Sequence, residues 1–418
     1  MGQLTLALPF IGILLSFAIL PALAPRLWHR RMAAVLLSWV VAAALLQTVT
    51  DGAAFALLRL WQAAASGFLP FIVLLLALYA LGGGIAIIGG PWGRPGGNLL
   101  LLALGTVLAS VMGTIGAALL LIHPLLAANG HRKEKRHLVL GFIILAGNCG
   151  GALSPLGDPP LLVGFLRGVP FFWPAAHLWL PLLIVALPVL ALVFALDVYL
   201  ARNEVPRPRK TMRVRGLLNV VLLLVLMVAI PLEGVWHPGD VSLFGARLPA
   251  EQLAVTLLAA LCIGISEAFT ASSIRRHNRF AWSAMREIVV LFFGIFVTIR
   301  PVFLLLAHAK LAQQPLLWFW ASGIASAVLD AAPTYLIFFQ AAGGHAASLA
   351  TSSAKLLTAI SAGSVFFGPL TYLGNAPNLM IREIASRRGV KMPRFFPYAG
   401  IMTLVLAPIL AVMGWALF

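Results

Sequence analysis

The stretch GGALSPLGDPP at residues 150–160 decides how the rest of this chain is interpreted. It interrupts a long apolar run with glycines, prolines, a serine and the carboxylate of Asp158. A helix that crosses lipid does not break where no water satisfies its freed backbone groups, unless protein or a wet cavity surrounds the break. The stretch therefore predicts a broken helix inside a larger membrane protein.

The composition supports a membrane protein. Hydrophobic residues make up 61% of the 418 residues, charged residues only 10%, and the mean hydropathy is +1.00. A soluble domain carries about 25% charged residues. The apolar segments are continuous and do not alternate, so we expect an all-α polytopic protein rather than a β-barrel. The N-terminal segment lacks a basic region and a small-residue cleavage site, which predicts a retained first helix.

The apolar windows predict about ten full transmembrane helices, because each approaches the ~20 residues that a span needs. The predicted spans are 4–24, 33–50, 68–90, 137–162, 174–199, 216–233, 249–268, 287–308, 353–381 and 396–416. Two further apolar stretches, 98–127 and 316–342, are interrupted in the middle. We expect each to be a re-entrant hairpin, which is tolerated where protein or a wet cavity surrounds it.

The basic residues support this topology. If both hairpins enter and leave on one side, six loops that hold 23 of the 29 Lys and Arg residues face the same compartment. By the positive-inside rule this compartment is the cytoplasm, and the protein is a multi-pass protein of the inner membrane. The same rule accounts for the net charge of +17, so we expect the lipid bilayer and no nucleic acid as a partner.

The two halves resemble each other. ASVMGTIGAALLLI (109–122) matches ASAVLDAAPTYLIF (325–338), and SPLGDPPLL (154–162) matches TYLGNAPNL (371–379). We predict a first repeat at 1–200 and a second at 216–418, joined by a basic cytoplasmic linker at 201–215. Each repeat would hold five spans and one hairpin, the first entering from the cytoplasm and the second from outside. Inverted repeats with broken helices are typical of secondary transporters with a midplane site.

The breaks in 137–162 and 353–381 carry the predicted site. Freed carbonyls can coordinate a cation, and the N-terminus of a half-helix can face an anion. Asp158 and Asp330 are the two carboxylates predicted near the midplane, where an ionisable residue usually marks an ion or proton pathway. In the repeat alignment Asp158 corresponds to Asn375, and Asp330 corresponds to Thr114.

Other polar residues complete the prediction. We expect an ion- or substrate-binding cavity lined by Asn148, Ser154, Thr334, Thr371 and Asn378, with any Na⁺ at Asp158, Asp330, Asn148 and Asn375. Arg300 lies inside a predicted span, so it needs a partner. It either pairs with one of the two aspartates or contacts an anionic cargo, since guanidinium suits carboxylates.

Three segments resemble the citrate transporter and sodium:proton antiporter-like family of the ion transporter superfamily. They are residues 147–173, 329–339 and 373–396, and the resemblance extends over nearly the whole chain. It implies two inverted repeats, each with a re-entrant hairpin and a broken helix, and a homodimer. The chain departs from the family pattern at Ala331, where LDNAP has Asn, and at Arg300, where an apolar residue is expected.

These observations favour a secondary transporter, not an enzyme, without a cofactor. No GxxxxGK[ST] loop is present, which argues against an ATP-driven pump in this chain. The first hypothesis is a Na⁺/H⁺ antiporter that uses the midplane carboxylates. The alternative is an ion-coupled transporter of citrate or another organic or inorganic anion, and a channel is a third class.

Overall fold

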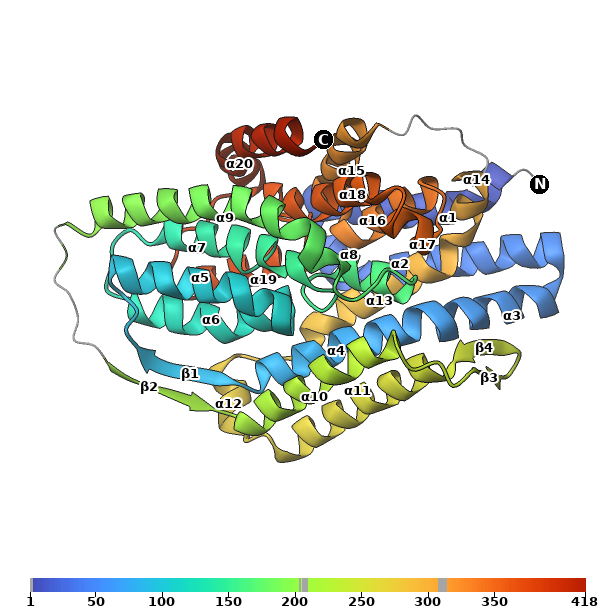
Figure 1. The fold of residues 1–418 in the computed structure, drawn as a ribbon, viewed down its shortest axis with the longest axis horizontal. Helices are drawn as coiled ribbons and strands as arrows, with labels where there is room; N and C mark the ends of the chain where they lie inside the picture. The colour runs from blue at the N-terminus through green and yellow to red at the C-terminus, as the bar shows by residue number, and fades with distance from the viewer. Residues whose placement is uncertain (1–2, 203, 205–209, 307–313) are drawn as a thin grey trace.

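The fold consists almost entirely of helices. The computed structural model describes residues 3–202, 204, 210–306 and 314–418 (Figure 1). In this part of the chain seven helices are long and apolar enough to cross a membrane. An eighth is counted if two helices that meet at a 48° bend, over Trp282–Thr298 and Arg300–Leu306, form one span. The protein is therefore a polytopic helical membrane protein, and the prediction of ten spans with two hairpins stays a prediction.

The helices pack in two groups, which we call the scaffold group and the hairpin group. The scaffold group holds α1 (Gln3–Leu23), α2 (Pro25–Asp51), α3 (Ala53–Ala63), α4 (Leu69–Gly83), α10 (Leu217–Glu233), α11 (Ala250–Phe269), α12 (Ser272–His277), α13 (Trp282–Thr298) and α14 (Arg300–Leu306). The hairpin group holds α5 (Pro95–Met112), α6 (Thr114–Ala128), α7 (Arg136–Leu145), α8 (Pro159–Leu166), α9 (Trp173–Leu200), α15 (Pro315–Leu329), α16 (Ala331–Ala341), α17 (Ala346–Ala350), α18 (Ala354–Phe366), α19 (Ala376–Arg387) and α20 (Phe395–Leu417). Helix α4 of the scaffold group packs directly on α6 and α8 of the hairpin group.

Both interrupted stretches are pairs of helices joined at a single residue. Helices α5 and α6 meet at Gly113, and α15 and α16 meet at Asp330. The two helices of each pair pack on each other. The prediction of an interruption in 98–127 and in 316–342 is confirmed.

Both predicted broken helices are also broken. In 137–162, α7 ends at Leu145, a 3₁₀ turn covers Cys149–Leu153, and α8 begins at Pro159. In 353–381, α18 ends at Phe366, a 3₁₀ turn covers Gly368–Leu370, and α19 begins at Ala376. Prolines at the first turn of α8 and α19 suit a helix start, because their missing N–H groups have no intrahelical partner there.

One prediction about the bounds of a span is wrong. The span predicted at 68–90 begins earlier, because α3 continues through a π-helical turn at Ala64–Phe68 into α4, which ends at Gly83. Residues Ala86–Gly90 form strand β1 instead of helix. Apolarity alone did not distinguish strand from helix in this short segment. Within the predicted linker at 201–215, residues Lys210–Arg215 form strand β2, antiparallel to β1.

A second ribbon lies at the opposite end of the molecule. Strands β3 (Asp240–Leu243) and β4 (Ala246–Pro249) form a hairpin whose turn is Phe244–Gly245 (Figure 1). Both turn residues have positive φ, as the two-residue turns of β-hairpins require.

Candidate functional site

The first half of the site is the tip of the α5–α6 hairpin. Gly113 turns the chain at φ 80°, a conformation that glycine adopts without a steric penalty. The next residue, Thr114, bonds to the first broken helix twice. Its backbone N–H donates to the carbonyl of Gly157 at 2.8 Å, and its hydroxyl donates to Oδ1 of Asp158 at 3.2 Å. The tip is therefore attached directly to the break.

Asp158 occupies the N-cap position of α8 in an extended conformation. The break before it is tightly folded, because a Cβ at Gly157 would lie 2.1 Å from the carbonyl oxygen of Gly151. Only glycine fits so close to the backbone. This close packing fixes the direction in which the aspartate side chain leaves the chain.

The second half of the chain builds the same backbone at the corresponding positions. Asp330 joins α15 to α16 at φ 80° and ψ 146°, and Gly113 has φ 80° and ψ 150°. Asn375 caps α19 in an extended conformation, as Asp158 caps α8. Gly113 and Asp330 are 217 residues apart, and so are Asp158 and Asn375.

This register corrects the predicted pairing of Thr114 with Asp330. The structural counterpart of Asp330 is Gly113, and the counterpart of Thr114 is Ala331. The sequence alignment was wrong by one residue at the tips, because runs of alanine and leucine match in several registers. The turn itself, with its positive φ, sets the register. The predicted pairing of Asp158 with Asn375 agrees with the structure.

The two breaks meet each other. Asn375 donates to Oδ1 of Asp158 at 2.9 Å, so this oxygen accepts from both Asn375 and Thr114. Beside them, Asn148 of the first break donates to Oδ1 of Asn378 at 2.7 Å. Helix α6 packs on α19 and α8 packs on α16, so each hairpin contacts the broken helix of the other half of the chain.

Both carboxylates are buried, with exposed fractions of 1% for Asp158 and 4% for Asp330. Within the described part of the chain, no basic side chain forms an ion pair with either of them. Oδ2 of Asp158 has no hydrogen-bond partner among the described residues. Oδ1 of Asp330 accepts a cap bond from the N–H of Ala332 at 3.2 Å.

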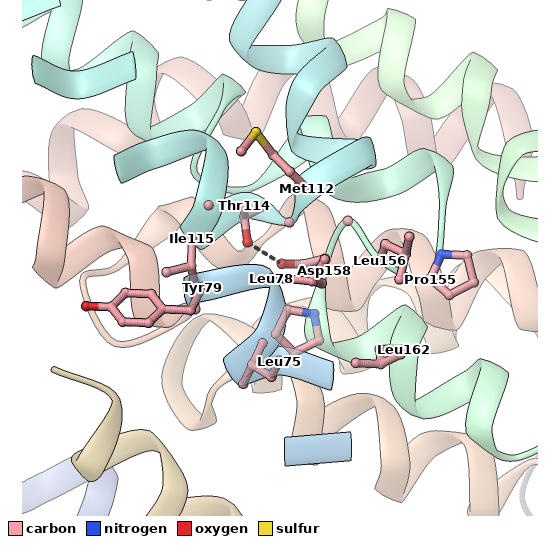
Figure 2. Close-up of a pocket in the computed structure, with 14 residues that line it drawn as sticks. Leu75, Leu78, Tyr79, Met112, Thr114, Ile115, Pro155, Leu156, Asp158 and Leu162 are labelled. Atoms are coloured by element: carbon pink, nitrogen blue, oxygen red, sulfur yellow. Dashed lines mark hydrogen bonds between the residues drawn. The ribbon is translucent and has the colours of Figure 1, made fainter. Parts of the chain in front are cut away.

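A small pocket opens at Asp158 (Figure 2). Its walls come from α4, the tip of the first hairpin, the first break and the start of α8. Leu75, Leu78 and Tyr79 provide the wall from α4. The pocket has room for about one water-sized group. It lies between the two helix groups, with the carboxylate on the hairpin side.

Three of the predicted polar residues hold the backbone in place instead of facing the pocket. The hydroxyl of Ser154 donates to the carbonyl of Ser110, and the hydroxyl of Thr371 donates to the carbonyl of Ala327 at 2.5 Å. These two bonds lie at corresponding positions of the two halves of the chain, and each ties a break to the hairpin of its own half. Thr334 donates to the carbonyl of Asp330 at 2.8 Å and so closes the first turn of α16.

Arg300 does not join the site. It is exposed at the start of α14, after the bend that ends α13. The predicted ion pair with Asp158 or Asp330 is therefore wrong: those carboxylates are buried in the hairpin group, whereas the bend in the span turns Arg300 outward. No contact in the described part of the chain supports its alternative role as an anion ligand.

Sequence reasoning missed two features of the site. The wall from α4 carries only leucines and a tyrosine, which nothing distinguishes from ordinary packing residues. Ser110 was also missed, although its hydroxyl donates to the carbonyl of Gly150 at 2.5 Å and accepts from the N–H of Leu153. A lone serine in an apolar helix gives no signal of such a role.

Comparison with known proteins gives one match that covers the chain. The family described as "Putative citrate transport" matches residues 2–418. No curated protein matches the chain.

Proposed function

The chain belongs to the family described as "Putative citrate transport", and from this membership and the geometry of its site we propose that it is a secondary active transporter that exchanges Na⁺ for H⁺ at Asp158 and Asp330. We further propose that it lies in the inner membrane as ten spans and two re-entrant hairpins, arranged as two inverted repeats. The shared turn at Gly113 and Asp330, and the shared caps at Asp158 and Asn375, support the repeat.

One observation carries the choice of ion. Asp158 is buried, one of its oxygens has no partner, and no basic side chain pairs with it in the described part of the chain. The penalty for burying an unpaired ion is several kcal/mol. The N-terminus of α8 offsets only about 0.3–1 kcal/mol, up to ~2 kcal/mol in the best buried geometries. Asp158 therefore needs either a bound cation or a bound proton. Because either one satisfies the carboxylate, binding of the cation is coupled to release of the proton.

The position of the site supports alternating access. Asp158 and Thr114 belong to the hairpin group, whereas Leu75, Leu78 and Tyr79 belong to the scaffold group. A movement of the hairpin group along α4 would carry the carboxylate past this wall. The contact between α4 and α6 suits such a movement, because glycines meet there: a Cβ at Gly82 would lie 2.7 Å from Cα of Gly116.

Ion-coupled transport of citrate is the second candidate. The description of the family favours it. A further observation is that the N-termini of α6, α8 and α19 meet at Asp158, where their partial positive charges suit an anion. The absence of a basic side chain from the lining of the pocket argues against a trivalent anion bound there without a cation.

Everted membrane vesicles separate these candidates. If antiport is correct, a dye that reports ΔpH responds to added Na⁺ or Li⁺, and Asp158→Asn removes the response. Uptake of labelled citrate, with a ΔpH that is indifferent to Na⁺, would replace the first candidate by the second. Flux that never saturates and moves no counter-ion would indicate a channel.

A further inference from the structure

A second buried polar cluster lies at the open end of the first hairpin, away from the pocket. We call it the Asp197 network, and it consists of Asn98, Asn129, Arg132, His137 and Asp197. These residues come from the start of α5, the end of α6 with the loop after it, the start of α7 and the end of α9. The helices concerned lie side by side (Figure 1).

Asp197 is the centre of the network. Its Oδ2 accepts from Asn98 at 2.9 Å. Its Oδ1 accepts from Nη1 of Arg132 and lies 3.0 Å from Nε2 of His137. Arg132 also donates to the carbonyl of Gly93 at 3.1 Å, so the loop before α5 is held by the same side chain.

Two amide side chains join the two helices of the first hairpin at this end. Asn98 donates to Oδ1 of Asn129 at 3.0 Å, and Asn129 donates back to Oδ1 of Asn98 at 2.8 Å. Asn98, Asn129, Arg132 and Asp197 are between 0% and 5% exposed, so water does not compete for these bonds. The two helices of the hairpin are therefore hydrogen-bonded to each other at their open end.

The second hairpin has no such polar network at the corresponding positions. The positions 217 residues later hold Pro315, Ala346, Leu349, Ala354 and Gly414. Gly414 of α20 packs instead on apolar side chains, because a Cβ there would lie 3.2–3.3 Å from Leu316, Phe319 and Trp320. Two hairpins with the same turn thus differ at their open ends.

We propose that the Asp197 network positions the tip of the first hairpin against Asp158, which makes its members positioning residues for the ion site. The importance of that site rests on the proposed function, but the positioning itself does not. Helix α5 has 18 residues and a length of about 27 Å, so it acts as a stiff arm between the network and the tip. A small rotation at its base displaces Thr114 from Gly157 and Asp158. A displacement of about 1 Å at a reacting centre can cost about 100-fold in rate.

Hydrogen exchange on the purified full-length protein tests this proposal without reference to cargo. The variant is Arg132→Met/Asp197→Leu, because removal of both charges leaves neither partner of the buried pair unpaired and packs apolar groups of similar size. Glu204, which also pairs with Arg132, has a side chain that is 21% exposed, so it keeps contact with water in the variant. We expect amide exchange at 112–118 to accelerate at least about tenfold, since the bond from Thr114 to Gly157 opens more often. Exchange at 329–335, in the tip of the second hairpin, stays as in the wild type.

The matched control is Asp51→Asn, which breaks an ion pair with Arg59 that is about one-third exposed and should change neither tip. Unchanged exchange at 112–118 in the double variant would overturn the proposal. Equal acceleration at both tips would overturn it too, because it would indicate general loosening.

A transport measurement adds an independent readout. In the double variant we expect the apparent KM for the transported ion to rise at least about tenfold while the maximal rate stays within about threefold. A lower maximal rate at unchanged KM would contradict positioning of the ion site. If the wild type moves no ion in this assay, the proposed function fails while the exchange result still decides the positioning.

Discussion

The turn at Asp330 gives the sharpest prediction of stability. The residue has φ 80° and ψ 146°, close to a region that is essentially restricted to glycine, and its structural counterpart is Gly113. We therefore compare Asp330→Gly with Asp330→Ala, which both lack the carboxylate and its cap bond. The backbone strain costs alanine about 1–3 kcal/mol. Glycine loses about 0.5–1 kcal/mol through its greater unfolded-state freedom. The glycine variant should thus be more stable by about 1 kcal/mol, and by at most about 2.5 kcal/mol.

Thermal unfolding of the two purified variants in the same detergent measures this difference. The expected order reverses the usual preference, since glycine within a helix is less stable than alanine by about 0.5–1 kcal/mol. A matched control is Gly113→Ala, which should destabilise the first hairpin because it introduces the same strain. Both Asp330 variants should lose Na⁺-dependent proton exchange. If Asp330→Ala unfolds at the same temperature as Asp330→Gly, or above it, the strain argument is refuted.

The remaining predictions concern the site and its borders. Asp158→Asn should keep the fold and abolish Na⁺-driven ΔpH changes in everted vesicles; a retained response would remove Asp158 from the exchange. Asn148→Ala should lower the free energy of unfolding by about 1–3 kcal/mol, because it leaves the buried Oδ1 of Asn378 without this donor, and an unchanged melting temperature would contradict this. Arg300→Gln should leave transport within about twofold of the wild type, since its side chain is exposed; complete loss of transport would show that Arg300 has a role in the site. Gly82→Val should lower the maximal rate, because its side chain collides with the backbone of α6, and a normal rate would show that this contact does not slide.

The breaks in the helices could be predicted because the residues that cause each break lie next to one another in the sequence. GGALSPLGDPP combines residues that stop a helix with a charge that lipid excludes, and the structure breaks at this stretch. The partner break at 371–375 followed from its G-x-x-P similarity to the first. The turn at Asp330 was expected for the same reason, since a carboxylate and a proline interrupt an apolar run there.

Contacts that depend on packing between distant segments could not be predicted from the sequence. The bond from Asn375 to Asp158 joins residues 217 positions apart, and the sequence alignment showed only that they are equivalent. Arg300 was given a partner because its place in an apolar run suggested burial, but the bend after α13 exposes it. Asp197 lies near the end of the predicted span 174–199, and the residues beside it in the sequence do not indicate that it binds Asn98 or Arg132.

Proton release on Na⁺ binding tests the central claim most directly. The purified wild-type protein is titrated with NaCl in weakly buffered solution near neutral pH, and choline chloride is the control for ionic strength. The account predicts that Na⁺ displaces protons from the wild type and none from Asp158→Asn/Asp330→Asn. Na⁺ binding without proton release, or the same release from the double variant, would contradict exchange at these two carboxylates.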